Sequence, residues 1–151
     1  HITGIDYDEE KIETANHCFS KTDNINFVHS DVMSFAFEKY DCIIMADMLH
    51  YLQPAEQKLV IEKCLQHLNA GGSIIIRDGD KDKEAMHKKT RLTEFLSTKV
   101  VNFNKTKETG LSFLSGSMIR EMAAANNMLC TEMADSKLTS NTLFILKAAN
   151  N

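Results

Sequence analysis

The sequence lacks the spacing patterns that build metal sites and disulfide frameworks. Its 151 residues contain no tryptophan, one proline and only four cysteines, Cys18, Cys42, Cys64 and Cys130. No two of these cysteines form a C-x-x-C pair, so the sequence predicts no metal centre. Each cysteine stands among apolar residues, and we expect all four to be small, reduced core side chains. This in turn favours a reducing, cytoplasmic environment.

Long apolar runs and concentrated positive charge are also missing. No stretch of about 18 apolar residues and no signal peptide is present, so the sequence predicts no membrane span. The formal net charge is -4, which argues against a nucleic-acid surface because phosphate binding needs clustered positive charge. With 43% hydrophobic and 25% charged residues, the chain has the composition of one globular domain, which we expect to span residues 1–151.

What the chain does contain is an alternation of strand and helix patterns, which predicts an α/β fold with a mostly parallel sheet. The expected strands are residues 2–6, 25–29, 40–46, 73–78, 128–134 and 142–147. The expected helices are residues 9–19, 53–68, 83–98 and 117–126. Only residues 135–141 separate the last two strands, too few for a helical crossover, so these strands should form an antiparallel hairpin. Residues 99–116 have no clear period and are expected to form an excursion over the sheet on the substrate side.

Acidic residues stand at the ends of the expected strands. These are Asp6, Asp31, Asp47 and Asp78. Ligands of open α/β sheets bind at the carboxyl ends of the strands. The Asp6 carboxylate has two oxygens and can therefore hold both hydroxyls of a ribose. A dehydrogenase that binds NAD uses an acid in the same way, and a solvated or helix-capping acid is the alternative without a ligand.

Short segments in a fixed order carry a family resemblance. They are Gly4-Ile5-Asp6-Tyr7-Asp8, His29-Ser30-Asp31-Val32, Tyr40-Asp41-Cys42-Ile43-Ile44 with Asp47-Met48-Leu49-His50-Tyr51-Leu52, and Leu68-Asn69-Ala70-Gly71-Gly72 running into Ser73-Ile74-Ile75-Ile76. Together they resemble the class I S-adenosylmethionine-dependent methyltransferases, beginning at that family's second strand. The resemblance implies a doubly wound, mostly parallel sheet with helices on both faces and a final antiparallel hairpin. Ala70 stands where the family commonly has proline.

One family feature is absent from the sequence. The family's first strand ends in a G-x-G-x-G loop that receives the methionine end of the cofactor, and none of the six glycines forms such a loop. The resemblance therefore implies an N-terminally truncated domain whose missing strand lies between the family's second and fourth strands. Losing that strand would expose two sheet edges. We expect an upstream segment or another copy of the chain to fill the slot, and we expect residues 1–151 alone to be inactive.

The resemblance also implies roles for individual residues in binding the cofactor, S-adenosylmethionine. Asp6 would bind the ribose, Tyr7 would lie against the adenine, and Asp31 would accept from the adenine amino group. Val32 would offer its backbone N–H to the adenine ring, and Asp47 would hold the ammonium group of the cofactor.

On the acceptor side, His50 is the candidate general base, because histidine has an unperturbed pKa near ~6.5. Its alternative role is structural, bonding to the backbone of its turn. Arg77 could bind a substrate carboxylate or phosphate in a forked geometry, or it could pair with an acidic neighbour. Tyr51 is expected on the substrate side, where it would pack against its surroundings rather than take part in the reaction.

These roles favour methyl transfer from S-adenosylmethionine to a small-molecule acceptor, by one domain of a longer protein. The sequence leaves two alternatives open: a nicotinamide-dependent oxidoreductase, or a non-catalytic interaction module.

Overall fold

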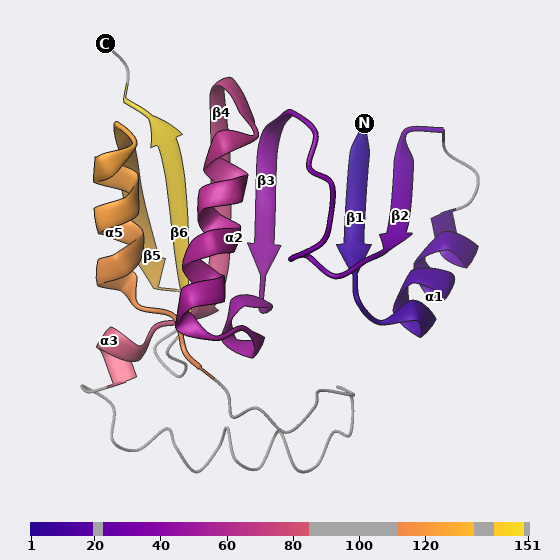
Figure 1. Cartoon of the computed structure of the whole chain (residues 1–151), viewed down its shortest axis with the longest axis horizontal. Coiled ribbons are helices and arrows are strands. Elements are labelled where there is room, and N and C mark those ends of the chain that lie inside the picture. Colours follow the sequence, from indigo (N-terminus) through magenta and orange to yellow (C-terminus); the bar gives the residue numbers. More distant parts are fainter. Residues whose placement is uncertain (20–22, 85–111, 135–140, 150–151) are drawn as a thin grey trace. The chain divides into compact units, whose positions relative to one another are not determined.

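The computed structural model describes residues 1–19, 23–84, 112–134 and 141–149. The chain divides into two compact units, His1–Phe37 and Glu38–Asn151. The element order is strand and helix in alternation, followed by a closing pair of strands (Figure 1). None of the helices in the described ranges is long and apolar enough to cross a membrane.

The first unit is a single parallel strand–helix–strand motif. It consists of β1 (Ile2–Asp6), α1 (Glu9–Phe19) and β2 (Ile25–His29). Asp8 begins α1, because its carboxylate accepts the backbone N–H of Glu10 at 3.1 Å. Among the side chains of α1 whose burial the structure describes, Ile12 is buried, with 7% exposed. Asp6 pairs with His29 in the parallel register, so β1 and β2 end at the same edge.

The second unit contains a four-stranded sheet in the order β3-β4-β6-β5. The strands are β3 (Tyr40–Ala46), β4 (Leu68–Gly79), β5 (Met128–Ala134) and β6 (Asn141–Ala148). The strands β3 and β4 are parallel, whereas β6 is antiparallel to both β4 and β5. This arrangement confirms the expected mostly parallel α/β fold and its closing antiparallel hairpin.

Two helices cover one face of this four-stranded sheet. The helix α2 (Pro54–Gln66) begins with a capping box between Gln53 and Glu56, and α5 (Gly116–Ala125) follows a capping side chain at Ser115. Figure 1 shows both helices on the same side of the sheet. Side chains that alternate along β4 and β6 are fully buried beneath them: Ile74, Ile76, Phe144 and Leu146. A 3-10 turn, η1 (Leu49–Tyr51), precedes α2, and the short α3 (Lys81–Glu84) follows β4.

The opposite face of the sheet is open in the described part of the chain. Ile44, Ile75 and Ile145 form one row across β3, β4 and β6. Ile44 is 67% exposed, and Leu129 and Met133 on β5 are 62% and 55% exposed. Strands of parallel sheets usually have both faces covered, so the described residues leave open an apolar face whose composition predicts a cover.

Several local expectations are corrected by the structure. The segment Leu68–Gly72 was expected to end a helix and form a turn, but it belongs to β4, because Leu68 already pairs with Tyr40. The helix expected from Ser117 begins at Gly116, and Ser115 rather than Ser117 is its cap. Of the cysteines, only Cys64 is buried; Cys18 and Cys42 are exposed and Cys130 is intermediate. The helix expected at residues 83–98 is seen only in α3, and its remainder and most of the excursion at 99–116 lie outside the described residues.

Candidate functional site

Asp6 and Asp31 lie at the edge where β1 and β2 end. The backbone N–H of Ser30 donates to the carbonyl oxygen of Asp6 (3.0 Å), which ties the two strand ends together. The Asp6 carboxylate accepts the backbone N–H of Asp8 at 2.9 Å through Oδ1. Its other oxygen, Oδ2, lies 3.8 Å from Lys11 Nζ. Asp6 is therefore held by its own turn, with one oxygen facing a partly exposed cation.

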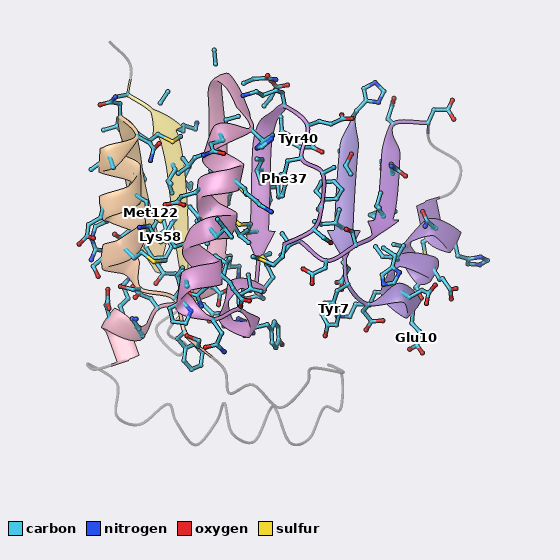
Figure 2. The ribbon with its side chains drawn as sticks, in the orientation of Figure 1. Tyr7, Glu10, Phe37, Tyr40, Lys58 and Met122 are labelled. Carbon is cyan, nitrogen blue, oxygen red and sulfur yellow. The ribbon has the colours of Figure 1, made fainter. Side chains whose placement is uncertain are left out.

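The neighbours of these acids are arranged around the same edge. Tyr7 is 43% exposed and lies beyond the end of β1 (Figure 2). Its carbonyl oxygen accepts from His29 Nε2 at 2.9 Å. Asp31 is exposed, and its carboxylate accepts the backbone N–H of Met33 at 2.8 Å. Val32, which follows Asp31, is half-buried. The first unit thus presents an exposed aromatic ring and two carboxylates at a single rim.

In the second unit, the turn after β3 lies against the end of β4. His50 Nδ1 is 2.7 Å from Asp78 Oδ1. The Asp78 side chain is 1% exposed and that of His50 is 17% exposed. The same carboxylate also accepts the backbone N–H groups of Leu49 and His50 through Oδ2, at 2.9 and 3.3 Å. The acid at the end of β4 therefore fixes both the backbone and the side chain of the histidine turn.

A buried glutamine holds the same turn from the other side. Gln57, on α2, is 2% exposed. Its Nε2 group lies within donor distance of the carbonyl oxygens of Leu49 (3.0 Å), Leu52 (3.1 Å) and Ser112 (2.6 Å). The backbone N–H of Ser112 in turn donates to the carbonyl oxygen of His50 at 2.9 Å. These bonds join η1, α2 and the segment before α5 around the histidine.

Aromatic rings flank the His50 imidazole. The ring centroid of Tyr51 lies 4.1 Å away, and that of Phe113 lies 6.4 Å away. Both aromatic residues are half-buried. Apart from the Asp78 carboxylate at Nδ1, the histidine therefore has aromatic neighbours and stands in a partly apolar setting.

Arg77 and Asp47 are paired with each other. Arg77 on β4 is paired in the sheet register with Ala46, the last residue of β3. Asp47 follows directly, and its carboxylate accepts a hydrogen bond from the Arg77 guanidinium. Asp47 has a positive φ of 51°, a conformation that is uncommon outside glycine and marks a tight exit from the strand. Sequence reasoning assigned these residues to cofactor and substrate separately, and it considered only acids near Arg77 in the chain as ion-pair partners.

The structure also identifies partners that the sequence reasoning missed. Asp78 was recognised as an acid at a strand end, but it received no role. It lies 28 residues from His50 in the chain, so no local pattern links them. Gln57 gave no signal either, because a glutamine on a helix usually faces solvent.

Comparison with known proteins finds methyltransferases and related enzymes. Residues 1–72 match the family model of a methyltransferase domain. A carboxy-S-adenosyl-L-methionine synthase from Campylobacter fetus subsp. fetus (strain 82-40) is 30% identical over 78 residues, which cover 51% of this chain and 33% of the relative. The chain thus matches about a third of the length of its curated relatives.

Solved structures share the fold. The N-methyltransferase NodS from Bradyrhizobium japonicum WM9, in complex with S-adenosyl-L-homocysteine, matches with a TM-score of 0.65 at 14% identity, over 98% of this chain and 66% of that one. An O-methyltransferase family protein from Burkholderia thailandensis matches with a TM-score of 0.72 at 15% identity, over 99% of this chain and 43% of that one. Over residues 1–72 the chain matches the methyltransferase-domain family, and over nearly its whole length it shares the fold of these solved methyltransferases.

Proposed function

We propose that residues 1–151 form a methyltransferase domain that binds S-adenosylmethionine and transfers its methyl group to a small-molecule acceptor. The observation that carries the proposal is the convergence of Asp6 and Asp31 on one edge of the β1–β2 pair. Acids at the carboxyl ends of adjacent parallel strands are placed where open α/β sheets bind nucleotides. The family match over the residues that contain both acids supports the same reading.

The residues present fit the adenosine half of the cofactor. A carboxylate has about four lone-pair sites, so Asp6 can accept ribose hydroxyls in addition to its bond from Asp8. Tyr7 is exposed enough to lie against a purine face. Asp31 and the backbone N–H of Val32 would read the adenine edge. The methionine half would need a glycine-rich loop, and none of the glycines in the sequence forms one.

The cofactor, when bound, supplies a methyl group that its sulfonium has already activated. The protein then needs to hold the acceptor, exclude water and remove a proton where the acceptor is an O–H or N–H group. His50 is the residue proposed to take that proton. Its position beside Tyr51 and Phe113 favours an acceptor with an apolar or aromatic body.

Arg77 and Asp47 would act as a pair at the substrate side. A guanidinium has five N–H donors in a forked geometry, and Arg77 directs one of them to Asp47; we propose that the same guanidinium binds a substrate carboxylate or phosphate. Asp47 is 47% exposed in its side chain, which leaves an oxygen for the ammonium group of the cofactor. Tyr51 would pack against the acceptor.

Calorimetric titration with S-adenosylhomocysteine and, separately, with NADH tests the proposal. We expect S-adenosylhomocysteine to bind more weakly than micromolar, because the loop for the methionine end is absent, and we expect Asp6→Asn to abolish the remaining heat. Asp23→Asn is the matched control, since Asp23 is an exposed acid that precedes β2 at the opposite end of the strand. Binding of NADH without binding of S-adenosylhomocysteine would favour an oxidoreductase over a methyltransferase. The absence of a heat signal with both ligands would favour a non-catalytic interaction module.

The domain is proposed to need one more strand. In the described residues, β1 pairs only with β2, and β3 pairs only with β4. Each therefore has one edge of unpaired backbone groups, which favours pairing with another segment. We infer that an upstream segment or a second copy of the chain supplies this strand. Light scattering would distinguish them: a doubled mass for residues 1–151 supports a second copy, whereas a monomer that becomes more stable when extended upstream supports a segment of the same polypeptide.

The free state of all four cysteines supports a reducing compartment, and a cytoplasmic location is part of the same proposal.

A further inference from the structure

The carboxylate of Asp78 is surrounded by hydrogen-bond donors. Its Oδ2 accepts the backbone N–H groups of Leu49 and His50 at 2.9 and 3.3 Å. Its Oδ1 accepts the backbone N–H of Gly79 at 2.8 Å and lies 2.7 Å from His50 Nδ1. The side chain is 1% exposed. A buried carboxylate is tolerated only when its oxygens are satisfied in this way.

These contacts determine which ring nitrogen of His50 carries the proton. An ionised carboxylate can only accept hydrogen bonds, and a neutral imidazole has one donor nitrogen and one acceptor nitrogen. Nδ1 must therefore donate to Asp78, which leaves the lone pair on Nε2. The two backbone bonds to the same carboxylate fix the turn that carries the ring, and the Tyr51 ring lies beside it with its plane tilted by 47°.

We infer that Asp78 is a positioning residue that holds His50 as the Nδ1–H tautomer, so that Nε2 is the atom offered to the acceptor proton. The inference rests on the proposed role of His50 as the base. During proton removal, the acceptor O–H or N–H bond breaks and the new N–H bond forms at Nε2. The acceptor's electron pair would form the bond to the methyl carbon, and the bond from that carbon to the sulfur of S-adenosylmethionine would break with its electron pair passing to sulfur. The imidazolium that results keeps its Nδ1–H bond to Asp78, whose negative charge stabilises it, and the proton on Nε2 later passes to solvent.

The inference predicts that the substitution Asp78→Asn changes the tautomer of His50. An asparagine amide would direct its oxygen toward the two backbone N–H groups of Leu49 and His50. The opposite orientation would set its amino group against both of these donors, whereas this one sets it against the N–H of Gly79 alone. The amino group would then face Nδ1 of His50 and donate to it. His50 would have to carry its proton on Nε2, which removes the basic atom from the acceptor side. In Ser-His-Asp hydrolases, the same exchange of carboxylate for amide imposes the wrong tautomer.

A matched control exists at the end of the same strand. Asp80 is also 1% exposed, and its Oδ1 accepts the backbone N–H groups of Gly116 and Asp82 at 3.1 and 3.0 Å. No contact joins it to His50 among the described residues. Asp80→Asn should therefore weaken the fold in a comparable way while leaving the imidazole unchanged.

The test is nitrogen-15 NMR of the full chain labelled at histidine, with His50→Gln used to identify the His50 signals. In the parent protein we expect the long-range proton–nitrogen pattern of the Nδ1–H tautomer; the Nε2–H pattern there would overturn the inference without any variant. Asp78→Asn should convert the signal to the Nε2–H pattern, and Asp80→Asn should not. An unchanged tautomer in Asp78→Asn would also overturn the inference.

Kinetics separate this inference from the proposed function. The kinetic test uses a form of the protein that is active in methyl transfer. In that form, Asp78→Asn should lower kcat at least about 100-fold with little change in KM, as expected for an interaction made in the transition state. A converted tautomer with an unchanged kcat would leave the positioning role intact and refute His50 as the base.

Discussion

At the scale of the residue, burial separates the four cysteines into reactive and inert thiols. Burial raises the pKa of the Cys64 thiol to about 12, partly offset by the positive charge of Lys63. Cys18 and Cys42 are exposed. Because the thiolate is the reactive species, we expect iodoacetamide at about pH 8 to alkylate Cys18 and Cys42 in the native chain and Cys64 only in urea. Peptide mass spectrometry measures this order, and equal rates at Cys42 and Cys64 would contradict it.

A second residue-scale prediction concerns Asp82 and the start of α5. The backbone N–H of Ser117 donates to the Asp82 carboxylate at 2.8 Å, and this bond is the largest cause that lowers the pKa of Asp82 below its usual value. A carboxyl with a lowered pKa in the folded state stabilises the fold above its unfolded pKa of about 3.9. That stability is lost as the pH falls through the lowered, folded-state pKa.

Asp82→Asn should therefore reduce the free energy of unfolding at neutral pH by about 0.5 kcal/mol, the scale of a charge at an exposed helix N-terminus. It should also flatten the decline in stability below about pH 4. Urea titrations at several pH values give both quantities. Glu121→Gln, an exposed change in the middle of α5, is the control, and an equal effect there would count against the specific bond.

At the scale of the element, Gln57 is the side chain that joins α2 to its surroundings. Its Nε2 group donates hydrogen bonds to the carbonyl oxygens of Leu49, Leu52 and Ser112. Gln57→Leu keeps the approximate size of the side chain but removes the shared donor. The carbonyl oxygen of Leu49 still accepts the backbone N–H of Leu52, whereas a buried acceptor left unsatisfied costs about 1–3 kcal/mol. We expect a loss of about 2 kcal/mol, because two of the three bonds are only partly buried. The urea midpoint should fall with an unchanged m-value.

Gln66→Leu provides the comparison for that change, since Gln66 is an exposed residue at the end of the same helix. An exposed substitution of this kind should alter the stability by less than about 0.5 kcal/mol. If both variants lost the same stability, the bonds of Gln57 would not be what holds η1 against α2.

Local patterns predicted most elements, and long-range partners decided the rest. The bounds of β1, β2 and β3 agree with the sequence expectation because their apolar runs end at polar residues. The start of β4 could not be predicted, since Leu68 becomes a strand residue only through its pairing with Tyr40. The start of α5 was misplaced for a similar reason: carboxylates of Asp80 and Asp82 accept its first N–H groups, and these residues are 36 and 35 positions away.

The candidate site shows the same division. Alternation and strand ends were sufficient to place the acids on sheet edges. The pairs His50–Asp78 and Arg77–Asp47 join residues 28 and 30 positions apart, and only the register of β3 against β4 brings them together. Motifs therefore predicted which acids lie at the strand ends, but not which side chains contact each other.

At the scale of the whole molecule, the open face of the four-stranded sheet should have measurable consequences. Exposed apolar patches on soluble proteins bind other apolar surfaces, so residues 1–151 should bind a hydrophobic fluorescent dye in their native state. Ile44→Thr should reduce that dye fluorescence, because Ile44 is 67% exposed and threonine keeps a high strand propensity. The free energy of unfolding should change by less than about 0.5 kcal/mol.

Ile76→Thr is the counterpart on the covered face, where Ile76 is 0% exposed. Replacing a buried ethyl group by a hydroxyl combines a cavity with an unsatisfied polar group, so this variant should lose at least about 2 kcal/mol. The contrast between the two isoleucines measures whether α2 and α5 cover one face alone. If Ile44→Thr were as destabilising as Ile76→Thr, and the dye did not bind, something in residues 1–151 would already cover the second face and the sheet would be packed on both sides.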